Sequence, residues 1–250
     1  MILSVITPTA DILGNPQEPN IISNNDSQLL YGETFEVLET HGAYVRGKST
    51  LDGYEGYVER VQLVKEAFPC NAVITAPLTH LFEQPDFKSR PLMPLSFFSR
   101  IYASAQREGG FTRTSNGWVF TDHMQEIKAL NLSKDLADIA LQYYGTPYLF
   151  AGRSYLGIDC SGLVQMAVMG LGHPCPPRDT KDQFDTIGIP AARDDLKRND
   201  IVYFNGHVGI MVDETNILNA TARFMSVVIE PLSNLETAYK GITSIRRISE

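Results

Sequence analysis

The chain has 250 residues, of which 43% are hydrophobic and 10% aromatic, so it can bury a substantial core and form two or three small domains. Its formal net charge of −8 argues against nucleic acid or an anionic membrane as the main partner, because both select basic surfaces. The sequence has three cysteines, lacks a run of about 18 apolar residues and begins without the basic and apolar segments of a secretion signal, which predicts a cytoplasmic protein.

Short strand-like runs separated by turns occupy residues 1–66. Residues 34–38 and 44–46 are rich in aromatic and β-branched side chains, and Tyr31-Gly32-Glu33 supplies a turn signal. Together with residues 53–58, this order resembles bacterial SH3 (SH3b) domains. The resemblance predicts a small β-barrel over residues 1–66.

A fainter copy of the same pattern follows in residues 67–128. Residues 109–113 echo residues 41–46, and Gly117-Trp118-Val119 echoes Gly56-Tyr57-Val58. Internal similarity of this kind predicts a second SH3b-like barrel.

An amphipathic helix begins the last part of the chain, for which we predict a single domain over residues 129–250. Ser133 is the predicted N-cap, Leu136 and Ile139 belong to the apolar face, and the helix is expected to end at Gly145. This helix should pack near the next one.

The second helix carries the first chemically informative residue. Apolar, helix-compatible residues from 162 to 169 predict a buried helix with Cys160 in its first turn. The unpaired N–H groups and the dipole of a helix start favour the thiolate, and a nearby imidazolium would favour it further. We therefore expect Cys160 to be nucleophilic near neutral pH.

A histidine follows in a strand context. Residues 200–204 and 207–212 are expected to be strands joined by Asn205-Gly206, a dipeptide that favours a type I′ turn. Asn219 lies in the next predicted strand, where its amide could meet the imidazole of His207. The result is a Cys-His-Asn arrangement, in which the imidazole activates the thiol and the amide fixes the tautomer and orientation of the ring.

Several separated motifs resemble the NlpC/P60 cysteine peptidases over roughly residues 130–250: Gly145-Thr146-Pro147-Tyr148, Asp159-Cys160-Ser161-Gly162-Leu163, Pro177-Arg178-Asp179 with Gln183, and Asp200-Ile201-Val202-Tyr203-Phe204 before His207-Val208-Gly209-Ile210. The resemblance implies an α+β fold, a papain-like catalytic domain preceded by the two barrels. Many relatives carry a second histidine where this chain has Asn219. An asparagine can still accept a hydrogen bond from Nδ1–H of the ring.

The two-part layout resembles enzymes of murein-peptide recycling, which cut the γ-D-glutamyl bond to a diamino acid in peptides with a free N-terminal L-alanine. The resemblance implies a thioacyl-enzyme, a small murein peptide as the substrate, and no cofactor or metal. It also implies substrate-binding residues in two places. Tyr148, Asp159 and Ser161 would line the groove, and Glu33, Tyr54 and Asp179 would bind the free amine.

Simpler interpretations stay open for most of these residues. Cys160 and His207 could be inert, and Asn219 an ordinary strand residue. Glu33 could be a solvated turn residue, Tyr54 a core aromatic and Tyr148 a packing residue, and Ser161 and Asp179 could each cap a helix.

Two other functions also stay open. One is a papain-like acyltransferase or amidase, and the other is a cell-wall peptide-binding module with a degenerate catalytic core. Zinc binding by Cys160, His173 and Cys175 is disfavoured, because their spacing matches no recognised zinc motif. The sequence does not fix the oligomeric state or the preferred diamino acid.

Overall fold

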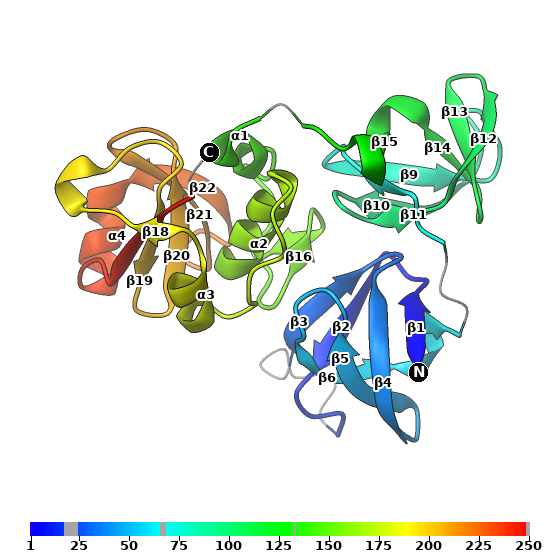
Figure 1. Ribbon diagram of the computed structural model, residues 1–250, viewed down its shortest axis with the longest axis horizontal. Helices are drawn as coiled ribbons and strands as arrows, with labels where there is room; N and C mark the ends of the chain where they lie inside the picture. The colour runs from blue at the N-terminus through cyan, green and yellow to red at the C-terminus, as the bar shows by residue number, and fades with distance from the viewer. Residues whose placement is uncertain (18–24, 66–68, 133, 249–250) are drawn as a thin grey trace. The chain divides into compact units, whose positions relative to one another are not determined.

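A computed structural model describes residues 1–17, 25–65, 69–132 and 134–248 (Figure 1). Its contacts divide the chain into two compact units, Met1–Leu130 and Asn131–Glu250. The three predicted domain ranges stay predictions, and the boundary between the first two falls within residues 66–68, outside the described residues.

The first unit begins with a seven-stranded antiparallel sheet in the order β3-β2-β6-β5-β4-β1-β7. Its strands are β1 (Ile2–Val5), β2 (Thr9–Leu13), β3 (Asn25–Leu30), β4 (Thr34–His41), β5 (Tyr44–Ser49), β6 (Glu55–Glu59) and β7 (Leu63–Val64). The strands predicted at residues 34–38 and 44–46 are confirmed as β4 and β5. Alternate residues of β5 point into a core that includes Phe35, Val45 and Val58.

The remainder of the first unit is also all-β. A five-stranded sheet has the order β10-β9-β14-β13-β12, and a three-stranded sheet has the order β11-β8-β15. The strands are β8 (Ala72–Ile74), β9 (Leu78–Phe82), β10 (Pro91–Ser96), β11 (Arg100–Ile101), β12 (Ala103–Glu108), β13 (Phe111–Thr114), β14 (Trp118–Phe120) and β15 (Met124–Glu126). The sequence repeat falls on β13 and β14, which pair with each other. Closure of either group of strands into a barrel stays a prediction.

The Tyr31-Gly32-Glu33 turn, between β3 and β4, packs against the second group of strands. Tyr31 belongs to the core that contains Leu81 and Leu95, and its hydroxyl accepts a hydrogen bond from Asn116 Nδ2 at 2.6 Å. Gly32 has φ 77°, and a Cβ there would lie 2.1 Å from the carbonyl oxygen of Arg100. The glycine therefore meets both a left-handed backbone and a close backbone approach.

The second unit is built on a six-stranded antiparallel sheet in the order β18-β23-β19-β20-β21-β22. Its strands are β18 (Ile189–Pro190), β19 (Ile201–Phe204), β20 (His207–Met211), β21 (Asn216–Thr221), β22 (Ser226–Pro231) and β23 (Ser244–Arg247), and β16 (Arg153–Ser154) pairs separately with β17 (Gly157–Ile158). The helices are α1 (Leu136–Leu141), α2 (Cys160–Gly170), α3 (Thr180–Thr186) and α4 (Leu232–Tyr239). Figure 1 shows α1 and α2 on one side of the sheet and α4 on the other.

Helices on both sides explain the continuous apolar runs in the central strands. Every residue of β19 and β20 is buried, as is every residue of α2. Helices α1 and α2 approach closely at Gly170, where a Cβ would lie 2.7 Å from Ile139 Cγ2. No helix among the described residues is long and apolar enough to cross a membrane.

Three local predictions in this unit are wrong. The N-cap of α1 is Asp135, whose side chain accepts a hydrogen bond from the Asp138 N–H at 2.7 Å, whereas the predicted cap, Ser133, lies outside the described residues. Helix α1 also ends at Leu141, before Gly145. In the β19–β20 turn only Gly206 has a positive φ, of 72°, so the turn is not type I′, which needs positive φ at both central residues.

Candidate active site

Cys160 is the first residue of α2, and its side chain is buried. The preceding residue, Asp159, caps the helix by accepting a hydrogen bond from the Gly162 N–H at 2.8 Å. The predicted helix, with the thiol in its first turn, is confirmed. The sulfur contacts the backbone N–H groups of Ser161 and Val208. Because Val208 directly follows His207, the start of α2 meets the start of β20.

A buried ion pair lies next to the thiol. Arg178 Nη2 donates to Asp159 Oδ2 at 2.6 Å, and the two side chains are only 2% and 8% exposed. Arg178 Nη1 also donates to Ser161 Oγ at 2.6 Å, and the Ala151 N–H donates to Asp159 Oδ2 at 2.9 Å. Ser161 is not the helix cap, so the capping interpretation of this residue is wrong. Contact of Asp159 and Ser161 with substrate stays a prediction, because both side chains are engaged within the chain.

Burial dominates the chemistry of the thiol. It raises the pKa of Cys160 from 9.0 to about 12, and the Asp159 carboxylate raises it too, whereas the Val208 N–H, Arg178 and the Ser161 N–H lower it. A change of this size corresponds to about 4 kcal/mol, whereas a helix start supplies about 0.3–1 kcal/mol and at most about 2. Burial therefore favours the neutral thiol in the resting site, and the nucleophilic thiolate expected near neutral pH stays a prediction.

His207 and Asn219 form the predicted pair, but through the other ring nitrogen. Nε2 of His207 lies 3.0 Å from Asn219 Oδ1, whereas the sequence suggested Nδ1. The strand register pairs Ile210 with Leu218, which places Asn219 two residues along β20 from His207. A ring as long as imidazole can reach a neighbour at this diagonal separation. Burial lowers the pKa of His207 from 6.5 to about 4, so the imidazole is neutral at physiological pH and can accept a proton.

Two tyrosines surround these groups. The ring of Tyr239, the last residue of α4, stacks on His207 with 4.4 Å between centroids and 8° between planes. Tyr148 is half-buried, and its pKa is raised by burial first and then by the charges that Cys160, Asp159 and Tyr239 can carry. The predicted groove residue Tyr148 therefore lies near the thiol as a neutral phenol. Tyr239 was missed because no sequence motif marks the end of α4.

The three predicted amine-binding residues have different environments. Asp179 occupies the N-cap position of α3, as the capping interpretation expects, but its side chain makes no capping hydrogen bond. Its side chain is 39% exposed, with Lys181 Nζ 4.0 Å away. In the first unit, Glu33 is 1% exposed and accepts a hydrogen bond from the Leu30 N–H at 2.9 Å, so it is not a solvated turn residue. Tyr54 is half-buried against the first core, in agreement with its interpretation as a core aromatic. Amine binding by all three stays a prediction.

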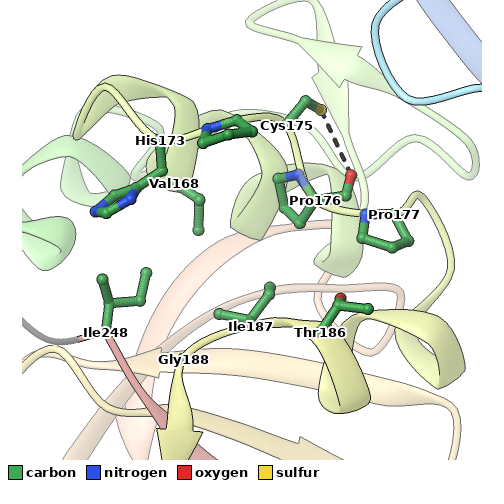
Figure 2. Close-up of a pocket in the computed structure, with 10 residues that line it drawn as sticks. Val168, His173, Cys175, Pro176, Pro177, Thr186, Ile187, Gly188 and Ile248 are labelled. Carbon is green, nitrogen blue, oxygen red and sulfur yellow. Dashed lines mark hydrogen bonds between the residues drawn. The ribbon is translucent and has the colours of Figure 1, made fainter.

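A separate pocket of about 520 Å³ lies between the loop after α2 and the segment that follows α3. Its lining is mainly apolar and includes Val168, Ile187 and Ile248, but neither Cys160 nor His207. Figure 2 shows the His173 ring and the Cys175 sulfur well apart along this loop, so they do not converge on one point. Among the described residues, no group of three or more His, Cys, Asp or Glu side chains is arranged to hold a metal ion.

Two family models match this chain. One is the NlpC/P60 family, over residues 145–246, and the other is the bacterial dipeptidyl-peptidase Sh3 domain, over residues 17–63. The first match contains the thiol, the imidazole and the amide described above. The second match lies within the seven-stranded sheet.

Relatives and a solved structure agree with these matches. The chain is 27% identical to the gamma-D-glutamyl-L-lysine dipeptidyl-peptidase of Bacillus subtilis, over 88% of this chain and 80% of that protein. It is 34% identical to a probable endopeptidase of Haemophilus influenzae, over 43% of this chain and 69% of that protein. The structure of an NlpC/P60 family protein from Bacillus cereus aligns with a TM-score of 0.84 at 19% identity, covering 99% of both chains.

Proposed function

The chain belongs to the NlpC/P60 family and is a peptidase, and from this premise we propose that it is a cysteine endopeptidase with Cys160 as the nucleophile. Its substrate is a small murein peptide with an unblocked N-terminal L-alanine. The scissile bond is the amide between the γ-carboxyl of D-glutamate and a diamino acid. The name of the Bacillus subtilis relative supports this choice of bond.

One observation carries the proposal. The thiol at the start of α2 contacts the Val208 N–H, directly after the His207 whose Nε2 meets Asn219. A thiol, a base and a group that orients the base are what covalent acyl transfer requires. The depressed pKa of His207 leaves its imidazole neutral, and hence able to act as the base.

The reaction begins from the neutral pair. As the Cys160 sulfur attacks the amide carbonyl, the thiol proton passes to Nδ1 of His207. The tetrahedral intermediate then collapses, its C–N bond breaks, and the imidazolium gives the proton to the departing amine. The remaining thioester is hydrolysed by water, whose proton His207 accepts and returns to the sulfur. The net reaction consumes one water and releases a dipeptide and a diamino acid or a peptide that begins with one.

The oxyanion of the tetrahedral intermediate needs hydrogen-bond donors. The first N–H groups of an α-helix have no partner within the helix, so the Cys160 backbone N–H is available at the start of α2. The neutral Tyr148 hydroxyl, whose pKa is raised by burial, is the second donor we assign. Each well-placed donor of this kind contributes about 3 kcal/mol to the transition state.

Recognition of the free amine accounts for release of a dipeptide. Asp179 has a partly exposed carboxylate with only a distant lysine beside it, which suits an ammonium group. Glu33 and Tyr54, in the first unit, stay candidates for binding the same amine. Release of L-Ala-D-Glu requires this end of the substrate to be bound in a fixed position.

The test compares L-Ala-γ-D-Glu peptides that end in L-lysine or diaminopimelate with their N-acetylated copies, with products identified by mass spectrometry. We expect L-Ala-D-Glu from the free peptides alone. Cleavage of both forms would keep the peptidase and remove the amine requirement. Cleavage of neither would contradict the substrate and favour an acyltransferase or a binding module.

The Asp179→Asn variant separates amine binding from catalysis. It should raise KM for the free peptide by about 10-fold, which corresponds to a lost charge-assisted hydrogen bond, and change kcat little. Lys181→Gln is the matched control, because it removes the neighbouring charge and keeps the carboxylate. An unchanged KM in Asp179→Asn would exclude Asp179 from the amine site.

A further inference from the structure

Asn219 is held from behind by a buried carboxylate. Asn219 Nδ2 donates to Glu230 Oε1 at 3.1 Å, and the second carboxylate oxygen of Glu230 accepts from Arg223 Nη2. Asn219 is 0% and Glu230 6% exposed, while the Arg223 side chain reaches the surface and is 31% exposed. Glu230 lies on β22, and Arg223 lies in the turn between β21 and β22.

This arrangement determines which end of the amide faces the histidine. An ionised carboxylate only accepts hydrogen bonds, so Asn219 must present its NH2 group to Glu230. Its oxygen then faces His207 Nε2, 3.0 Å away, and can only accept. Nε2 must therefore carry the proton, and Nδ1 is left with the lone pair that a base requires.

Resting on the proposed function, we propose that Glu230 and Arg223 are positioning residues for catalysis. Glu230 fixes the orientation of the Asn219 amide, and Asn219 in turn fixes the Nε2–H tautomer of His207. Arg223 pairs with the second oxygen of Glu230 and holds the carboxylate against Asn219. Neither residue touches the substrate, and both act through Asn219.

Because Glu230 and Arg223 carry opposite charges near His207, replacing either one should change the pKa of His207. The Glu230 and Asp159 carboxylates raise the pKa of His207, and Arg223 lowers it, against the larger lowering by burial. The ring also contacts the Asn219 amide and the rings of Phe204 and Tyr239. Loss of the Glu230 charge should therefore lower the pKa of His207, and loss of the Arg223 charge should raise it.

A steady-state experiment uses Glu230→Gln, which keeps shape and removes charge, beside Arg223→Gln. Glu230→Gln should lower kcat by about 10-fold or more, because a glutamine can face Asn219 with either end and no longer enforces the tautomer. KM should change little. The acid limb of the pH profile of kcat/KM should move to lower pH in Glu230→Gln and to higher pH in Arg223→Gln. Glu214→Gln removes an exposed carboxylate near the start of β21 and should leave kcat and the profile unchanged.

A second readout does not need turnover. In protein labelled with ¹⁵N-histidine, the ring nitrogen signals of His207, assigned by their loss in His207→Gln, report the tautomer directly. We expect Nε2–H in the unaltered protein and a mixture of tautomers in Glu230→Gln. Nδ1–H in the unaltered protein, an unmixed tautomer in Glu230→Gln, or acid limbs that shift in the same direction would overturn the proposal. If the peptide is not cleaved at all, the proposed function fails while the tautomer measurement still decides this one.

Discussion

Two parts of the site, the start of α2 and the strands β20 to β22, each place a buried carboxylate that is paired with an arginine behind a reactive group. We call them the helix side and the sheet side. On the helix side, Asp159 directly precedes Cys160 and pairs with Arg178 at 2.6 Å. On the sheet side, the Glu230 carboxylate is separated from His207 by the Asn219 amide. A full charge therefore lies directly beside the thiol, whereas the hydrogen-bond partner of the imidazole is a neutral amide oxygen.

This difference explains why the Cys160 thiol and the His207 imidazole have different roles. Burial, and after it the Asp159 carboxylate, favours the protonated thiol, and burial favours the neutral imidazole. We therefore predict an uncharged resting pair, in which the histidine is the group that can accept a proton. On the helix side, Asp159 and Arg178 hold the start of α2 that carries the nucleophile. On the sheet side, Asn219 leaves Nδ1 of His207 to accept the thiol proton.

Replacing the thiol should have the largest effect. Cys160→Ala removes the nucleophile, so peptide cleavage should fall by at least about 1,000-fold while binding of the peptide persists. Cleavage is followed by mass spectrometry, and binding by calorimetry. Cys175→Ala is the matched control, because Cys175 is a cysteine of the same unit that lines the separate pocket, whose lining includes neither Cys160 nor His207. Turnover by Cys160→Ala near the level of the control would remove the nucleophile assignment.

Breaking the helix-side pair should mainly affect folding. Arg178→Met leaves the Asp159 carboxylate, 8% exposed, without its counter-charge, and should lower the free energy of unfolding by about 3–5 kcal/mol. Arg193→Met is the control, because Arg193 is 53% exposed and pairs with Glu236 at the surface, where such a pair contributes at most about 1 kcal/mol.

Urea denaturation can assign this loss to the second unit. The only tryptophan, Trp118, lies in the first unit, so its fluorescence reports that unit, while circular dichroism reports both. Equal losses in Arg178→Met and Arg193→Met would show that the buried pair has no special role.

The buried His207 should make the free energy of unfolding depend on pH. The pKa of His207 is about 4 in the folded chain, against an ordinary 6.5, so between these values the unfolded chain binds more protons. The contribution is therefore complete above about pH 6.5 and is lost as the pH falls towards 4, a loss of about 3 kcal/mol. The same denaturation at each pH, compared with His207→Gln, isolates this contribution. Parallel pH curves for the two proteins would contradict the depressed pKa.

The sequence predicted the features that local pattern controls. The apolar run after Cys160 indicated α2, and the residues around His207 and Asn219 indicated β20 and β21. The charges and orientations within the site could not be predicted this way. Arg178 contacts Asp159 across 19 residues of sequence, and Tyr239, at the end of α4, stacks on His207. The Asn219 oxygen meets Nε2 of His207, a choice of ring nitrogen that no sequence pattern marks. Such contacts exist only after the chain has folded.

The pH dependence of Cys160 alkylation tests the neutral resting pair most directly. Iodoacetamide labelling of Cys160 can be measured by peptide mass spectrometry from about pH 5 to about pH 10, with Cys175 as the internal reference. We predict a rate that keeps rising with pH across this range, because the pKa of the Cys160 thiol is about 12. A plateau already reached by about pH 6, and abolished in His207→Gln, would reveal a preformed thiolate–imidazolium pair and contradict the account.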